Sequence, residues 1–355
     1  MKINRRTIIN VVIAVAIYGI VQGLIGGGML SRQMTSLIIP ICVYVMMAVS
    51  LCLVVGFLGE LSLGHAGFMS IGAYSGALFL THTELPQLPA LLIALLIGGA
   101  AAAVFGLIIG VPVLRLTGDY LAIVTLGFGE IIKSIINFMT PITGGAKGLS
   151  KIPLYTTYRN FTFVFILTVI VVLLVSNIVH SRHGRAITSI RDNYIAAEAA
   201  GIPVSRYKIM TFVIAAFFAG VAGALYSCAN ATLSTSSFAF TNGGILNSTF
   251  IVVMVVLGGM GSITGSVAAA VIMFFINYQI KNGSWVDSLP AAVQAVFQYP
   301  MLVYAIVLIV VIMFRPRGIF GSYEFSLINL KRDLKAALER RAAAKAERKE
   351  ARSNG

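Results

Sequence analysis

Glu130 and Lys133 are ionisable residues inside an otherwise mostly apolar stretch, residues 120–139. Because they are three positions apart, they share one face of a helix, where a carboxylate and an ammonium group can pair. Ionisable groups inside membrane spans are rare and usually face the bundle interior or a wet cavity. The pair is therefore either structural and deep in a bundle, or placed near a substrate or an inner gate. Thr125 and Gly127 of the same stretch are further candidates for a substrate path or gate.

A second concentration of polar groups occupies residues 56–76, which contain six glycines, three serines, one Glu and one His. Small residues let membrane helices approach closely, so tight packing is one interpretation. Glycine mixed with polar groups also indicates a broken or re-entrant helix on a substrate path or gate. The histidine fits a hydrogen-bonded buried residue, with a proton relay as the alternative. The candidates here are Ser62, Gly64, His65, Gly67 and Tyr74.

A third region, residues 257–268, has a similar pattern, with Gly259 and Gly261 beside Ser and Thr residues. Like residues 56–76, it follows an apolar run that we interpret as entering the cytoplasmic side. Two Gly- and Ser-interrupted segments in opposite halves of a chain indicate a translocation path built from repeated units. The similarity between the halves does not by itself define a repeat.

Common catalytic and nucleotide-binding motifs are absent from the sequence. It has no GxxxxGK[ST] phosphate loop, no HExxH and no GxSxG, and no cluster of Asp or His across the apolar runs. We therefore expect no catalytic residue, metal or cofactor on this chain. If it takes part in active transport, the energy has to come from a partner.

Composition identifies the class of protein. The 355 residues are 58% hydrophobic and 11% charged, with a mean hydropathy of +0.93, whereas a soluble domain has about 25% charged residues. An all-α, polytopic membrane protein is expected. The net charge of +14 follows from where the basic residues fall, so no nucleic-acid partner is expected. Cys42, Cys52 and Cys228 lie in apolar runs and should be small buried residues.

A span needs about 20 mainly apolar residues, and ten stretches qualify. They are 7–25, 35–57, 66–82, 89–113, 120–139, 162–180, 209–229, 244–261, 264–281 and 299–315. No small-residue cleavage site follows the first stretch, which we therefore interpret as a retained span. Lys and Arg concentrate in the ends and loops that are inside when the N-terminus is cytoplasmic. Ten spans then place both termini on the cytoplasmic side of a bacterial-type cell membrane.

The polar segment 181–208 separates two long apolar runs and is dense in Lys and Arg, which indicates the cytoplasmic side. Within it, residues 187–200 are good helix formers without proline, and Gly201 and Pro203 follow as stop signals. The apolar positions of this helix are Ile187, Ile190, Tyr194, Ile195 and Ala199. A short amphipathic helix between spans predicts a docking surface that receives force from a soluble partner.

We expect a membrane domain over residues 1–322 and a basic cytoplasmic tail over residues 323–355. The tail is rich in Ala, Lys, Arg and Glu and should be helical near anionic lipid headgroups, with docking to a partner protein as the alternative. Residues 282–298, with Trp285, suit an amphipathic segment at the outer interface.

Seven stretches in combination resemble the LivM-type permeases of branched-chain amino acid ABC importers. They are GELSLGHAGFMSIGAY (59–74), RLTGDYLAIVTLGFGEI (115–131), TGGAKGL (143–149), GRAITSIRDN (184–193), AEAAGI (197–202), VLGGMGS (256–262) and FRPRGIFG (314–321). The resemblance runs from about residue 35 to residue 322.

The resemblance implies a heteromeric importer of branched-chain, or more broadly neutral, amino acids. This chain would assemble with a homologous second permease, two ATPases that bind ATP and Mg²⁺, and an extracytoplasmic solute-binding protein. The coupling loop of the family corresponds to residues 181–208, with Glu198, Ala199 and Gly201 at its core and Arg185 and Arg191 beside them. The general importer pattern is EAAxxxG, whereas here the glycine follows the alanines directly.

Three alternatives remain. Permeases of importers for urea, amides or sugars are similar to this family. A secondary carrier or channel acting alone would show proton-dependent uptake without an ATPase, with Glu130 or His65 essential. An integral-membrane enzyme would need a catalytic constellation that the sequence lacks.

Overall fold

The structure, a computed structural model, describes residues 5–27, 32–116, 118–156, 160–239, 248–282, 300–315, 318–319 and 321. The chain divides into two units, residues 1–29 with 324–355, and residues 30–323. The first unit contributes helix α1 (Arg5–Gly26). The predicted tail helix within 323–355 and residues 283–298 of the predicted interfacial segment, with Trp285, lie outside the described residues.

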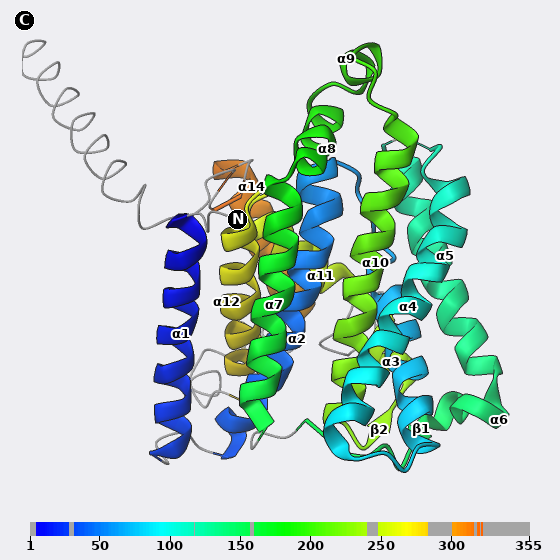
Figure 1. The fold of residues 1–355 in the computed structure, drawn as a ribbon, viewed down its shortest axis with the longest axis vertical. Helices are drawn as coiled ribbons and strands as arrows, with labels where there is room; N and C mark the ends of the chain where they lie inside the picture. Colours follow the sequence, from blue (N-terminus) through cyan, green and yellow to red (C-terminus); the bar gives the residue numbers. More distant parts are fainter. Residues whose placement is uncertain are drawn as a thin grey trace, which may run out of the picture. The chain divides into compact units, whose positions relative to one another are not determined.

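The second unit is a bundle of helices, as predicted (Figure 1). Its longer helices are α2 (Arg32–Cys52), continued by the π-helix η1 (Leu53–Leu58), α3 (His65–Thr81), α4 (Gln87–Val113), α5 (Asp119–Phe138), α7 (Phe161–His180), α10 (Val204–Ala229), α11 (Ser248–Gly258), α12 (Ile263–Asn282) and α14 (Pro300–Phe314). Its short elements are α6 (Thr140–Thr143), η2 (Gly145–Lys147), β1 (Leu149–Ser150), α8 (Arg182–Asp192), α9 (Tyr194–Ala199), β2 (Thr232–Leu233) and η4 (Thr235–Phe238).

Every predicted span overlaps a helix of the structure. Among the described residues, six helices are long and apolar enough to cross a bilayer: Met34–Leu58, Gln87–Val113, Asp119–Phe138, Phe161–His180, Val204–Ala229 and Ile263–Ile280. Val15–Gly26, Ser248–Gly258 and Leu302–Phe314 are shorter apolar helices, and α3 has 17 residues. Ten spans and two cytoplasmic termini stay predictions.

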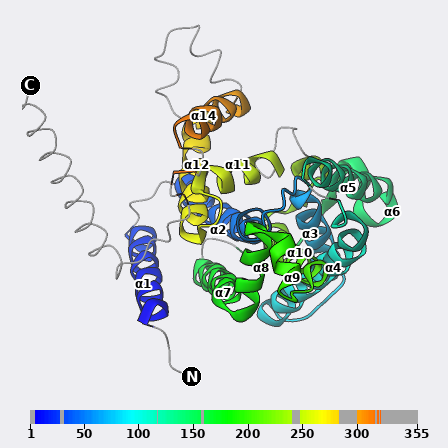
Figure 2. The ribbon, with the colours of Figure 1, turned by 90° about the horizontal axis from the view of Figure 1, so that it is seen from above.

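Helices α3, α4 and α10 pack at backbone distance. A Cβ atom on Gly72 of α3 would lie 2.1 Å from the carbonyl oxygen of Gly220 on α10. A Cβ atom on Gly98 of α4 would lie 2.8 Å from the carbonyl oxygen of Gly72. Glycine is needed where helices meet this closely, so the tight-packing interpretation is confirmed for this part of residues 56–76. Figure 2 shows α5 at the periphery beside α3 and α4, and α7 at the periphery beside α2.

The outer surface of the second unit carries large apolar side chains. Leu92, Leu96 and Ile108 of α4 are exposed, as are Ile166 and Ile170 of α7. A continuous apolar surface of this kind is unfavourable in water but suits the hydrocarbon core of a bilayer. The chain is therefore an integral membrane protein.

The prediction of one helix over residues 187–200 is wrong. Helix α8 ends at Asp192 and α9 starts at Tyr194. Between them, the backbone of Asn193 is extended (φ −161°, ψ 101°), and its side-chain oxygen accepts a hydrogen bond from the amide of Ala196 at 3.0 Å. Asparagine is a strong N-cap, so it starts a new helix and does not continue the old one.

Two short strands were not anticipated by the all-α prediction. β1 and β2 pair in antiparallel fashion, with Leu149 opposite Leu233 and Ser150 opposite Thr232. The hydroxyl of Tyr74 on α3 donates a hydrogen bond to the carbonyl oxygen of Leu233 at 3.1 Å, which anchors the strand pair to the bundle. The strands and α6 lie at the end of the unit opposite α8 and α9 (Figure 1).

Candidate functional site

Helix α8 packs one face on the bundle and exposes another. The hydroxyl oxygen of Ser181 caps it by accepting a hydrogen bond from the amide of Gly184 at 3.2 Å. Ile187 and Ile190 are buried, and Arg185 is exposed. The first two residues of the predicted apolar face therefore hold α8 in place and are covered by the chain itself.

Helix α9 presents the rest of that face to solvent. Tyr194 and Ile195 are 55% and 64% exposed, and Glu198 and Ala199 are also exposed. Two large exposed apolar side chains beside a carboxylate form a surface suited to protein contact. The exposed apolar positions of the predicted docking surface thus lie on α9.

Gly201 ends α9 in a Schellman motif. The amide of Gly201 donates to the carbonyl of Glu198 at 2.9 Å, and the amide of Ile202 donates to the carbonyl of Ala197 at 3.0 Å. This motif requires a left-handed residue, and Gly201 has φ +82°. In the described part of the chain, no atom lies within 4 Å of a Cβ atom built on it. Gly201 is therefore needed for its backbone conformation, while the space around it is open.

The first predicted interruption is present at residues 59–64. Helix α2 widens into the π-helix η1, which ends at Gly59 in the left-handed region (φ 80°). Isolated π-helical turns are rare and frequently occur at functional sites. Ser62 is buried, and its hydroxyl has no hydrogen-bond partner among the described residues. Helix α3 then begins at His65.

The second predicted interruption separates α11 from α12. Gly259 and Gly261 both have positive φ angles, 119° and 100°. A Cβ atom on Gly56 of η1 would lie 2.6 Å from the amide nitrogen of Gly261, so the two interruptions touch. The sulfur of Cys52 also lies 3.8 Å from the carbonyl oxygen of Ser262. We call this contact between η1 and residues 259–262 the junction.

Arg191 lies over the junction. Its Nη1 donates a hydrogen bond to the carbonyl oxygen of Gly56 at 2.9 Å, and its Nη2 and Nε contact Oδ1 of Asp192 at 2.9 and 3.1 Å. Its Cγ would be 2.6 Å from a Cβ atom on Gly59. Arg191, predicted to serve coupling, is therefore turned toward the bundle, where it links α8 to η1.

A buried ion pair between Glu60 and Lys208 was missed by the sequence reasoning, which counted Lys208 only as a basic loop residue. The carboxylate of Glu60 accepts a hydrogen bond from Nζ of Lys208, and both residues are buried. The available signal was a lone acid within a glycine-rich interruption and a basic residue, two positions after Arg206, at the start of an apolar run. That signal does not identify which two residues pair.

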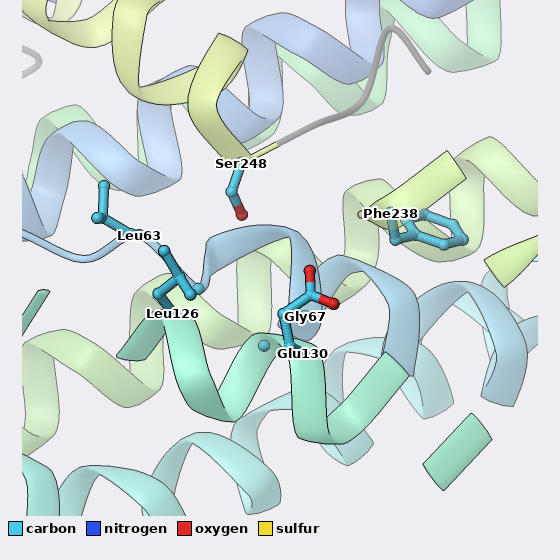
Figure 3. Close-up of a pocket in the computed structure, with 8 residues that line it drawn as sticks. Leu63, Gly67, Leu126, Glu130, Phe238 and Ser248 are labelled. Atoms are coloured by element: carbon cyan, nitrogen blue, oxygen red, sulfur yellow. The ribbon is translucent and has the colours of Figure 1, made fainter. Parts of the chain in front are cut away.

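A small pocket lies where α3 and α5 meet the N-terminal end of α11 (Figure 3). The lining residues are Leu63, Gly64, Gly67, Leu126, Gly129, Glu130, Phe238 and Ser248. The carboxylate of Glu130 and the hydroxyl of Ser248 point toward the same space (Figure 3). Gly64, Gly67 and Glu130 were predicted, whereas Phe238 and Ser248 were not. A serine at the start of an apolar helix was the only sequence signal for Ser248.

Helix α5 lies directly on the first interruption. The hydroxyl of Thr125 accepts a hydrogen bond from the amide of Leu63 at 3.1 Å and donates to the carbonyl of Ala122 at 2.9 Å. A Cβ atom on Gly64 would lie 2.0 Å from the carbonyl oxygen of Thr125. At Gly127, by contrast, the described residues leave open space. Leu63 and Gly64 are therefore held directly against the backbone of α5.

The predicted ion pair of α5 is present, with 2.9 Å between Nζ of Lys133 and Oε2 of Glu130. The side chains are 26% and 40% exposed, respectively. The pair therefore lies at the edge of this unit and not deep in the bundle. A charged pair at the surface of a membrane helix needs cover from protein or water.

His65 and Tyr74 have structural partners. Nε2 of His65 lies 2.7 Å from Oγ of Ser50, and the ring is buried, which is the arrangement of a hydrogen-bonded buried histidine. Tyr74 contacts the strand pair and does not line the pocket. Of the predicted path residues, Gly64, Gly67 and Glu130 line the pocket, and Gly259 and Gly261 lie at the junction. The other predicted path residues line neither. They are Ser62, His65, Tyr74, Thr125, Gly127 and Lys133.

Comparison with known proteins identifies the family. Residues 33–312 match the family model described as "Branched-chain amino acid transport system / permease component". The chain belongs to this family. It is 32% identical over 322 residues to the high-affinity branched-chain amino acid transport system permease proteins LivM of Salmonella typhimurium and Escherichia coli, covering 82% of this chain and 71% of each relative.

A more distant relative is the probable branched-chain amino acid transport permease protein LivM of Methanocaldococcus jannaschii. It is 24% identical over 244 residues, which cover 64% of this chain and 68% of the relative. No solved structure matches the chain. The chain is thus a LivM-type permease, and the transporter class expected from the resemblance is confirmed.

Proposed function

We propose that this permease imports branched-chain amino acids as one subunit of an ATP-driven transporter in the cell membrane of a bacterial-type cell. The observation that carries the proposal is α9, a short helix that exposes Tyr194 and Ile195 on a chain without a nucleotide-binding motif. Such a transporter needs separate ATPases, and those subunits would bind the ATP and Mg²⁺. We expect no cofactor on this chain.

The α8–α9 segment would receive the ATPase movement. Glu198, Ala199 and Gly201 are exposed around the apolar tip of α9, and Arg185 is exposed on α8. Because α8 is held by Ile187 and Ile190, force applied to α9 would reach the bundle through α8.

A homologous second permease would cover α5. On this helix Ser134 and Asn137 are exposed, and Glu130 and Lys133 are partly exposed. Lipid hydrocarbon cannot satisfy these groups, whereas a second permease with a wet path between the two subunits can. The pocket with Glu130 and Ser248 would open onto that path. Its few polar groups suit passage of a zwitterion and not tight retention.

An extracytoplasmic solute-binding protein would deliver the amino acid to the end of the bundle that carries β1 and β2. The strands lie opposite α8 and α9, so solute entry and ATPase docking would occupy opposite ends. Membrane lipid would contact the apolar outer faces of α4 and α7.

The proposal is tested by co-expressing this chain with the ATPases, second permease and binding protein encoded beside it, and reconstituting the complex. ATP-dependent uptake of leucine, isoleucine and valine is expected, with no uptake when the binding protein or an ATPase is omitted. Competition with urea, short-chain amides and ribose tests the related importers. Proton-driven uptake by the purified chain alone would instead indicate a secondary carrier.

A further inference from the structure

Two basic residues from the segment between α7 and α10 hold the connection between α2 and α3 at neighbouring points. Arg191, at the end of α8, donates to the carbonyl of Gly56 at 2.9 Å. Lys208, near the start of α10, pairs with Glu60. Gly56 lies within η1 and Glu60 just after it. Both flanks of α9 are therefore tied to one short piece of chain, residues 56–60.

The Glu60–Lys208 pair is almost completely removed from solvent, with side-chain exposures of 11% and 10%. Taking two charges out of water is costly, and their attraction often only offsets that cost. A buried pair is therefore weak evidence of added stability, and its best-attested use is to fix the register of two elements or to operate a switch. Here it fixes α10 against residues 56–60.

Residues 59–64 can follow a displacement because they are outside any regular helix. Gly59 is left-handed, and the amide of Glu60 bonds back to the carbonyl of Val54 at 3.2 Å, across the π-helical turn. The same segment continues directly into Leu63 and Gly64, which line the pocket. A shift of Glu60 is thus passed to the pocket within four residues.

We propose that Glu60–Lys208 and Arg191–Gly56 form a two-point clamp that passes displacement of α8 and α9 to the α2–α3 connection. Glu60 and Lys208 are positioning residues, since they act through the connection and not on solute. This inference rests on the proposed function, because it needs a partner that moves α9.

The test uses the complete reconstituted importer and compares three forms of the pair. The first is wild type, the second is Glu60→Gln with Lys208→Met, and the third is the swap Glu60→Lys with Lys208→Glu. Assembly, thermal stability, ATP hydrolysis and leucine uptake are measured on each. Arg115→Glu, a charge reversal at an exposed residue on the connection between α4 and α5, is the matched control.

The neutral double variant should assemble and keep its thermal stability, because both charges are removed together. Its leucine uptake per ATP hydrolysed should fall at least about fivefold, and the swap should recover about half of the loss. Arg115→Glu should keep the wild-type ratio. A neutral double variant with the wild-type ratio, or a swap no better than that variant, overturns the proposal.

A second measurement remains decisive if the neutral variant does not assemble. Glu60→Cys and Lys208→Cys, in a background with Cys42, Cys52 and Cys228 replaced by Ala, are joined by a short cleavable thiol linker. If Glu60 and Lys208 stay together throughout transport, the linked transporter should still show ATP-driven uptake. If linking blocks uptake and cleavage of the linker restores it, the proposal is overturned. Failure of the wild-type complex to import any branched-chain amino acid counts against the proposed function instead.

Discussion

Ser50 of α2 and His65 of α3 face each other across the first interruption, with 2.7 Å between Oγ and Nε2. The hydroxyl of Ser50 also donates to the carbonyl of Met47 at 2.9 Å, so its oxygen is left to accept from the ring. Both residues are buried. The pair therefore joins the two helices that the interruption separates, which favours a structural histidine over a proton relay.

Ser50→Ala should lower the free energy of unfolding by about 1–3 kcal/mol, because it leaves the buried imidazole without this partner. Thermal unfolding of the purified protein measures the loss. Ser75→Ala is the control, since among the described residues that hydroxyl bonds the carbonyls of Ile71 and Gly72 in its own helix. In the complete importer, His65→Gln should leave the shape of the pH profile of uptake unchanged. A selective change of that profile at wild-type stability would support a relay.

Gly72→Ala should destabilise the bundle, since the added Cβ atom would lie 2.1 Å from a backbone carbonyl oxygen on α10. Forcing the helices apart should cost about 1–3 kcal/mol, visible as a lower Tm and reduced amount in the membrane. Gly127→Ala places the same methyl group in open space on α5 and is the matched control. Equal losses in the two variants would contradict the packing argument.

Gly201→Trp should reduce uptake without removing the protein from the membrane. The described residues leave room for the side chain, so it would project from the end of α9 toward the ATPase. Backbone strain at φ +82° adds about 1–2 kcal/mol locally. Gly118→Trp isolates the strain, because Gly118 also has a positive φ (63°) and open space. The ratio of uptake to ATP hydrolysis should fall for Gly201→Trp and exceed any fall for Gly118→Trp.

Tyr194→Ser with Ile195→Ser should weaken the docking of the ATPase by at least about tenfold, because it removes two exposed apolar anchors. Glu198→Lys should uncouple ATP hydrolysis from uptake while the complex remains assembled. Affinity of the purified permeases for the ATPases, and uptake per ATP, measure the two effects. Arg115→Gln, on the connection between α4 and α5, is the comparison for a change of surface charge alone. If the double serine variant bound the ATPases with wild-type affinity, α9 would not be part of the interface.

Local patterns account for what the sequence predicted well. Helix positions follow from the length of apolar runs, and the interruptions follow from glycine clusters at residues 56–76 and 257–268. The Glu130–Lys133 pair follows from helical spacing. Each of these needs only residues that are near one another in the sequence. The structure confirms all three.

Contacts between distant residues could not be predicted in this way. Glu60 and Lys208 are 148 positions apart, and Arg191 and Gly56 are 135 apart, so no periodicity relates them. The pairing of Leu149 with Leu233 is likewise non-local. The break at Asn193 is local. The apolar pattern continues through residue 193, but the capping of α9 by the Asn193 side chain ends α8 and starts a new helix.

The hydrogen bond from Tyr74 to Leu233 attaches the strand pair to helix α3. Helix α3 carries this bond on one side and begins, at His65, where the α2–α3 connection ends. Helix α3 is therefore attached to the α2–α3 connection at its start and to the strand pair at Tyr74. In the proposed importer, a displacement of the strand pair and a displacement of the α2–α3 connection would both act on this one helix.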